Sequence, residues 1–119
     1  MPQTSHKFDL EERTAKFGED IILLCREIRQ DSVNRRIINQ LIRSATSIGA
    51  NYEEANGASS KKDFRNKIYI CKKEAQETRH WIRMLSVACP EVKQPLIDLK
   101  QEVHELVLIF QKIASSLNH

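Results

Sequence analysis

The chain has 119 residues, with 40% hydrophobic and 29% charged residues and a net charge of +3. This length suits one domain with its own core, and three glycines and three prolines are typical of an all-helical protein. No apolar run approaches the roughly 18 residues of a membrane-spanning helix, so we expect no membrane partner. The odd number of cysteines and the lack of an apolar leader predict a cytoplasmic protein.

Apolar residues recur at three- and four-residue steps along almost the whole chain, which is the period of an amphipathic α-helix. They predict four helices, at about residues 9–29, 32–56, 60–88 and 95–117. Helices of this length with short connectors pack most simply as an antiparallel up-down-up-down four-helix bundle. We therefore predict an all-α fold in which residues 1–119 form one domain.

Capping residues lie at the predicted helix boundaries. Asp31 or Ser32 is placed to accept the free N–H groups of the second helix. Gly57 is placed to end that helix in the left-handed conformation. Ser60, followed by Asp63, resembles a capping box and predicts the start of the third helix.

The stretch SATSIGANYEEANG, residues 44–57, lies in the second predicted helix although many of its residues are weak helix formers. Glycine alone costs roughly 1 kcal/mol relative to alanine in a helix interior. We interpret Ala45, Gly49 and Ala50 as part of a shallow surface of small residues. Another helix, from the same chain or from a second copy, can approach such a surface closely.

No motif for catalysis is complete in the sequence. Glu77 and His80 have the Glu-x-x-His spacing of di-iron bundles, but such a site needs two of these motifs and two further glutamates. We interpret this pair as part of a solvated helix face. Cys25 and Cys71 fall on apolar helix faces and are interpreted as core residues. We therefore expect no enzymatic activity, no metal site and no cofactor.

Basic residues are segregated on one flank of the third predicted helix. At about 100° per residue, five of them fall within about 40° of one another, and the acidic residues of this helix lie on the other flank. Mixed charges are usual on a solubilising face, so segregation by sign counts against a merely solvated face, which stays the alternative to a nucleic-acid-binding surface. Tyr69 borders the flank and is placed to stack on a base. The predicted nucleic-acid-binding residues are Arg36 and Arg43 on the second helix and Lys61, Arg65, Lys72, Arg79 and Arg83 on the third.

Two apolar residues of the third helix, Ile70 and Trp81, fall outside its predicted core face. On a single chain they would be exposed beside acidic residues. Tryptophan is enriched at the centres of protein interfaces, so these residues indicate a contact between copies of the chain.

Three runs of sequence carry a family resemblance. They are QLIRSATSIGANYEEA (residues 40–55), SSKKDF (residues 59–64) and CKKEAQETRHW (residues 71–81). Together they resemble the four-helix-bundle family of the 23S rRNA-intervening-sequence proteins, to which the accessory protein of diversity-generating retroelements is related. The resemblance extends over about residues 8–117. The family pattern of the second helix is met by Gln40, Arg43, Ala45, Ser47, Ile48, Asn51 and Glu54.

The chain departs from this pattern at Gly49, where many relatives have proline, and at Ala55, where many have glycine. Both departures keep the residue small. Asn51 and Glu54 lie beside the apolar face of the second helix, where they are placed either to hydrogen-bond across a helix or subunit contact or to bind a ligand directly. The predicted oligomer interface comprises Gly49, Asn51, Glu54, Ile70 and Trp81.

The resemblance implies a homopentamer without known enzymatic activity. For the retroelement relative it implies a basic surface that binds nucleic acid and a partner protein. We therefore predict a non-catalytic homo-oligomer that acts as an RNA-associated or adaptor protein, with structured RNA or a nucleic-acid-binding protein as its partner. The alternative is a protein–protein interaction module with no nucleic-acid partner.

Overall fold

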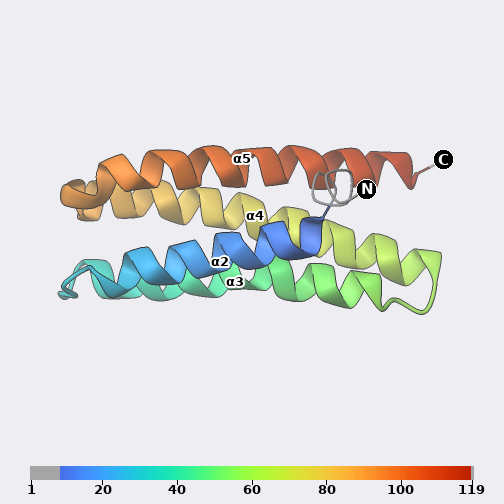
Figure 1. Ribbon diagram of the computed structural model, residues 1–119, viewed down its shortest axis with the longest axis horizontal. Helices are drawn as coiled ribbons and strands as arrows, with labels where there is room; N and C mark the ends of the chain where they lie inside the picture. The colour runs from blue at the N-terminus through green and yellow to red at the C-terminus, as the bar shows by residue number, and fades with distance from the viewer. Residues whose placement is uncertain (1–8, 119) are drawn as a thin grey trace.

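The chain folds into four long helices joined by short connections (Figure 1). The computed structural model describes residues 9–118, and this range contains no β-strand. The predicted all-α fold is confirmed, and the helix bounds agree with the predicted ones to within one helical turn. The elements are α2 (Leu10–Arg26), α3 (Asn34–Asn56), α4 (Lys61–Ala88), the short 3-10 helix η1 (Pro90–Val92) and α5 (Lys93–Ser116).

The helices form an up-down-up-down bundle about 46 Å long (Figure 1). Each helix packs against the next one in the chain, and α2 completes the bundle by contacting α5. The backbones of the diagonal pairs, α2 with α4 and α3 with α5, do not approach each other closely in residues 9–118, although the rings of Tyr52 on α3 and Phe110 on α5 meet in the core with centroids 5.9 Å apart. As a result, the outer face between α2 and α3 lies on the opposite side of the bundle from the face between α4 and α5.

The core is built from the apolar stripes of all four helices. Phe17 and Ile21 of α2, Leu41 of α3, Ile82 of α4 and Phe110 of α5 are all at most 2% exposed. Burying a large apolar side chain contributes about 1.5–3 kcal/mol, so these stripes supply the main driving force for folding. The predicted core faces are confirmed.

Helices α2 and α3 approach closely through their glycines. Gly18 is buried, and a Cβ added to it would lie 3.5 Å from Cα of Thr46. A Cβ added to Gly49 would lie 3.3 Å from Oγ1 of Thr14. The small-residue surface of α3 therefore receives α2 of the same chain, which confirms the same-chain form of the prediction.

The first predicted helix is too long at its C-terminal end. Glu27 and Ile28 donate backbone hydrogen bonds to Leu24 and Cys25, three residues back, and this tightening ends α2 at Arg26. Ile28 is nevertheless 8% exposed, so the apolar period continues past the helix. That continuation explains why the sequence predicted a longer element.

A reciprocal pair of side chains precedes α3. Oδ1 of Asp31 accepts from the backbone N–H of Asn34 at 2.8 Å, and Oδ1 of Asn34 accepts from the backbone N–H of Asp31 at 2.9 Å. This arrangement has the logic of a capping box. Asp31, rather than Ser32, is therefore the residue that caps the start of α3.

Gly57 does not adopt the predicted left-handed conformation, because its φ is −98° and its ψ is 12°. The chain leaves α3 through right-handed turns instead, in which Gly57 and Ala58 donate to carbonyls three residues back. The predicted start of α4 is confirmed, since Oγ of Ser60 accepts from the backbone N–H of Asp63 at 3.0 Å.

Candidate nucleic-acid interface

A line of basic side chains follows the groove between α4 and α5. At one end of the bundle, Lys61, Lys62 and Arg65 at the start of α4 face Ser116 and Leu117 at the end of α5. These five residues line a hollow of about 340 Å³. Lys72, further along α4, falls on the same flank of the helix at about 100° per residue.

The groove continues toward the other end of α4. There Nη1 of Arg79 lies 3.3 Å from Nδ1 of His104 on α5, and both residues line a hollow with Lys100. Arg83 lines the next hollow together with Lys93. No Asp or Glu lines any of these three hollows within the described part of the chain. Four of the predicted nucleic-acid-binding residues of α4 therefore line hollows between α4 and α5 that no carboxylate lines, and Lys72 falls on the same flank of α4 between them.

The sequence prediction missed the contribution of α5 to this groove. Lys93 and Lys100 are seven residues apart and His104 follows four residues later, so all three lie on one flank of α5. The spacing of these residues is visible in the sequence, but it indicates a shared groove only once this flank of α5 is known to face α4. Arg79 and His104 meet only in the fold.

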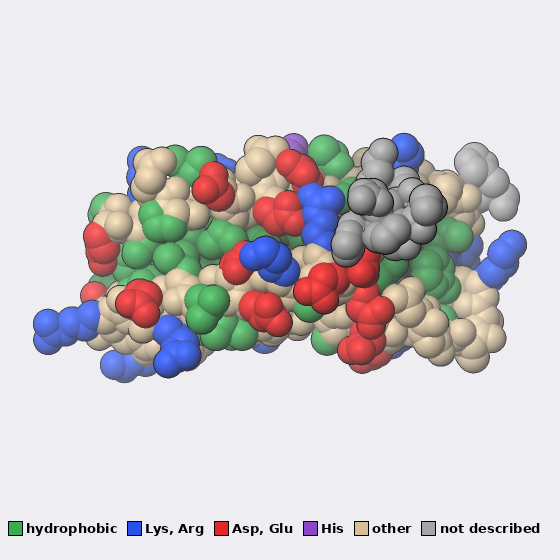
Figure 2. Space-filling view, in the orientation of Figure 1, with side chains coloured by type: hydrophobic (Ala, Val, Ile, Leu, Met, Phe, Trp, Pro, Cys, Tyr) green, Lys and Arg blue, Asp and Glu red, His purple; other side chains and the backbone are tan. Residues whose placement is uncertain are grey.

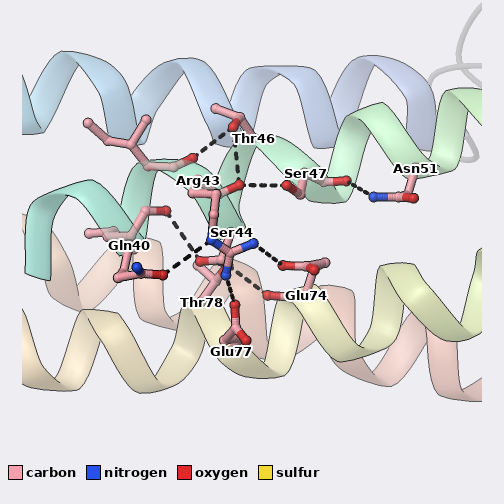
Figure 3. Close-up of polar contacts among 11 residues, drawn as sticks. Gln40, Arg43, Ser44, Thr46, Ser47, Asn51, Glu74, Glu77 and Thr78 are labelled. Atoms are coloured by element: carbon pink, nitrogen blue, oxygen red, sulfur yellow. Dashed lines mark hydrogen bonds and ion pairs between the residues drawn. The ribbon is translucent and has the colours of Figure 1, made fainter.

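Arg43 lies outside the groove, on the face between α3 and α4 (Figure 3). Its guanidinium pairs with Glu74 at 3.4 Å and with Glu77, and its Nε donates to the side-chain oxygen of Gln40 at 3.2 Å. Arg36 is exposed on α3, which does not contribute to the α4/α5 hollows. Neither arginine therefore joins the five basic residues of α4 in that groove.

Several polar residues of the run at residues 40–55 make hydrogen bonds along α3 and with α4 (Figure 3). Oγ1 of Thr78 donates to Oγ of Ser44 at 2.8 Å in a buried position. Nδ2 of Asn51 donates to the carbonyl of Ser47 at 2.8 Å, one turn back on the same helix. Glu54 pairs with Lys67 of α4 at 2.8 Å. The Ser44 and Glu54 contacts join α3 to α4 within one chain, whereas the Asn51 contact stays within α3.

The predicted oligomer interface is divided between two faces. Gly49 lines the outer groove between α2 and α3, whereas Glu54 contacts α4. Ile70 and Trp81 are half-buried, and Trp81 packs against the core, so the expectation that both are exposed on a single chain is wrong. A large side chain at the edge of a core stripe reaches the core when the neighbouring helix leaves room beside it. Nε1 of Trp81 is buried and has no hydrogen-bond partner in residues 9–118.

The Glu-x-x-His pair does not converge on a common point. Glu77 pairs with Arg43, while the ring of His80 lies edge-on against Trp81 with centroids 4.9 Å apart. Among residues 9–118, no three His, Cys, Asp or Glu side chains are grouped so as to hold a metal ion.

The cysteines occupy core positions. Cys25, Cys71 and Cys89 are buried and unpaired with one another. Burial raises the pKa of the Cys25 thiol to about 11 and that of the Cys71 thiol to about 12. A thiolate is the reactive form, so both groups are unreactive near neutral pH. The interpretation of Cys25 and Cys71 as core residues is confirmed.

The opposite face of the bundle is acidic. The outer groove between α2 and α3 has a volume of about 550 Å³, and small residues such as Ala15, Gly18 and Ala50 line it. In Figure 2, acidic side chains gather around the N-terminal half of α2. No Lys or Arg lines this groove in the described residues, and its carboxylates are Asp9, Glu11, Glu12, Glu19 and Glu53. The two grooves on opposite sides of the bundle are thus lined by charges of opposite sign.

An ion pair connects α2 with α5. Nε of Arg13 bonds Glu102 at 2.7 Å and its Nη2 bonds Glu105 at 2.7 Å. These bonds raise the pKa of Arg13. Hydrogen bonds from Gln101 and then Arg13 lower the pKa of Glu105. Figure 2 shows basic and acidic side chains meeting here, beside a band of hydrophobic side chains between the two helices.

The fold defines a small helical-bundle protein in which two outer grooves on opposite sides are lined by charges of opposite sign. The chain belongs to the 23S rRNA-intervening sequence protein family, whose model matches residues 6–113. The resemblance seen in the sequence is thereby confirmed.

Comparison with solved structures gives a similar result. A crystal structure of a protein of unknown function from the S23 ribosomal protein family of Bacteroides thetaiotaomicron matches with a TM-score of 0.76 and 29% identity. The match covers 87% of this chain and 96% of the other. No functionally curated protein matches the chain. None of the helices in residues 9–118 is long and apolar enough to span a membrane.

Proposed function

We propose that the protein is a non-catalytic, homo-oligomeric bundle that associates with structured RNA through the α4/α5 groove. The observation that carries this proposal is the row of cations on one flank of α4, whose hollows against α5 are lined by no carboxylate in the described residues. From Lys61 to Arg83 the row extends about 33 Å, at the α-helical rise of about 1.5 Å per residue. A row of this length and sign suits a phosphate backbone.

The acidic face favours a single mode of docking. Its carboxylates repel a polyanion, so RNA is expected to approach only from the α4/α5 side. The family description, 23S rRNA-intervening sequence protein, also refers to an RNA and therefore supports RNA as the partner. A binding role rather than a catalytic one is supported by the buried thiols and by the pairing of Glu77 with Arg43.

The salt dependence of RNA binding tests the groove. Each phosphate that is neutralised releases condensed counterion, so five contacts give a slope of log affinity against log salt of roughly −4 to −5 on a duplex and about −3.5 on a single strand. Replacing Lys72 and Arg79 with Gln should flatten the slope by about two for each engaged chain. Fluorescence anisotropy with a labelled RNA hairpin at several salt concentrations measures both values.

A matched control removes the same charge elsewhere. Lys16→Gln with Arg26→Gln changes two exposed residues of α2, which does not line the α4/α5 groove. This variant should lower affinity only slightly and leave the slope unchanged. If the wild-type protein binds no RNA at about 50 mM salt, or if both double variants give the same slope, the protein–protein module without a nucleic-acid partner replaces this proposal.

We further propose that copies of the chain assemble through the faces on either side of α3. The α2/α3 groove and the α3/α4 face are different patches, and a ring requires a heterologous interface of this kind. The family resemblance suggests five copies. Light scattering should then give a mass near five times 13.8 kDa.

A charge placed in the α2/α3 groove tests this assembly. Ala50→Glu adds a carboxylate that an interface would desolvate, so it should lower the mass, whereas Gln111→Glu at an exposed position of α5, away from α3, should not. A monomeric wild-type protein would contradict the assembly.

A further inference from the structure

One end of the basic groove combines cations with an exposed aromatic ring. Lys61, Lys62 and Arg65 line the hollow of about 340 Å³ between the start of α4 and the end of α5. Tyr69 follows Arg65 by four residues, which places it one helical turn further along the same side of α4. Tyr69 is 40% exposed, which is high for a large aromatic side chain.

The ring of Tyr69 is held at its outer end. The Tyr69 hydroxyl lies 3.4 Å from Oδ1 and 3.3 Å from Nδ2 of Asn118. Asn118 directly follows Leu117, which lines the hollow. The contact is made by the hydroxyl, and the residue is still 40% exposed, one helical turn from Arg65.

The size of the hollow favours a small unit over a helical one. Ligand pockets have volumes of about 300–1,000 Å³, and this hollow is at the lower end of that range. Bases inside a duplex are already stacked and cannot reach an aromatic side chain, whereas unpaired bases stack on tyrosine readily. The three cations of the hollow are placed to bind the phosphates on either side of such a base.

We infer that this end of the groove binds an unpaired nucleotide of an RNA, with its base on Tyr69 and its phosphates on Lys61, Lys62 and Arg65. The inference rests on the proposed function, because it assigns part of the RNA to part of the same groove. The remainder of the groove contacts phosphates irrespective of sequence. Tyr69 therefore determines which RNA is preferred, and the cations determine how strongly RNA is held.

Two RNAs with the same number of nucleotides test this assignment. One is a blunt-ended duplex with no unpaired nucleotide, and the other is a shorter duplex with a single-stranded tail. Base stacking on an aromatic residue contributes between about fivefold and a hundredfold in affinity, so the wild-type protein should prefer the tailed RNA by a factor in this range. Tyr69→Leu should abolish the preference and leave the salt slope unchanged, because it removes no phosphate contact.

Tyr69→Phe is the matched control, because it keeps the ring and loses only the contact with Asn118. It should retain most of the preference. A 2-aminopurine placed in the tail should be quenched on binding to the wild-type and Phe proteins but not to the Leu protein. Circular dichroism should show equal helicity for all three.

The outcomes separate the two proposals. Equal affinity of the wild-type protein for both RNAs, with a steep salt slope, overturns the nucleotide site and leaves the RNA-binding function intact. A preference for the tailed RNA that persists in Tyr69→Leu also overturns the site. Failure to bind either RNA overturns the proposed function and this inference with it.

Discussion

The pairing of Arg43 with two carboxylates predicts that its replacement weakens the fold rather than RNA binding. Arg43→Gln removes the guanidinium that lies between Glu74 and Glu77 on α4. The side chain of Glu74 is only 12% exposed, whereas those of Arg43 and Glu77 are 47% and 39% exposed. The substitution therefore leaves one largely enclosed carboxylate without its cation.

The expected magnitude follows from these exposures. An exposed ion pair contributes about 0.2–1 kcal/mol, because water and salt screen it. A hydrogen bond to a charged group contributes about 1.5–3 kcal/mol when it is shielded from water. The Glu77 pair belongs to the first class and the Glu74 pair lies between the two. We therefore expect the free energy of unfolding to fall by about 1–2 kcal/mol, which lowers Tm by roughly 3–12 °C.

Urea unfolding of a double-mutant cycle measures this interaction. Arg43→Gln, Glu74→Gln and the double variant should show a coupling energy of about 0.5–1.5 kcal/mol. Once either partner has been replaced, replacing the other no longer breaks the ion pair and therefore costs less. Arg43→Lys should retain part of the stability, since a lysine supplies charge but not the planar fork. The RNA salt slope of Arg43→Gln should equal that of the wild-type protein.

The opposite pattern of results would show that Arg43 contacts RNA. If Arg43→Gln unfolds at the wild-type urea concentration and flattens the RNA salt slope as Arg79→Gln is expected to do, then Arg43 is a ligand contact. The predicted nucleic-acid role of Arg43 would then hold, and the carboxylates on α4 would be its partners only in the absence of RNA.

Two further predictions concern the contacts of α2. The lowered pKa of Glu105 means that its contribution to stability is present above its usual pKa of 4.5 and is lost as the pH falls below that value, so Glu105→Gln should flatten the decline of the urea midpoint below about pH 4.5. Gly18→Ala should raise Tm, because the added Cβ meets Thr46 at ordinary contact distances and alanine favours the helix by about 1 kcal/mol. Gly49→Ala should gain less, since its Cβ would lie 3.3 Å from Thr14.

The fold could be predicted because the residues that define it repeat with one period. Phe17, Ile48, Ile68 and Val103 each lie on a stripe that the three- and four-residue spacing identifies without reference to any other helix. Helix ends were harder, because they depend on single hydrogen bonds. Ile28 continues the apolar stripe although the helix has already ended, and no pattern in the sequence distinguishes these two situations.

The surface could be predicted only in part, because a charged residue at the edge of a helix face has more than one possible partner. Arg79 and Arg43 look alike in the sequence, yet one lies beside His104 and the other between two glutamates. Which of these occurs depends on how α3 and α5 are placed against α4. The same holds for Trp81. Whether its ring packs against the core or is exposed depends on where the neighbouring helix lies.

The separation of charge across the bundle links assembly with RNA binding. Assembly through the faces beside α3 covers the acidic α2/α3 groove and leaves the α4/α5 groove of each copy open. Covering carboxylates against a neighbour also reduces the repulsion that RNA meets near the particle. An RNA long enough to contact several copies then gains from effective concentration, and its salt slope grows with the number of chains engaged. Loss of assembly in Ala50→Glu should therefore make the salt slope shallower even though no residue of the basic groove has changed.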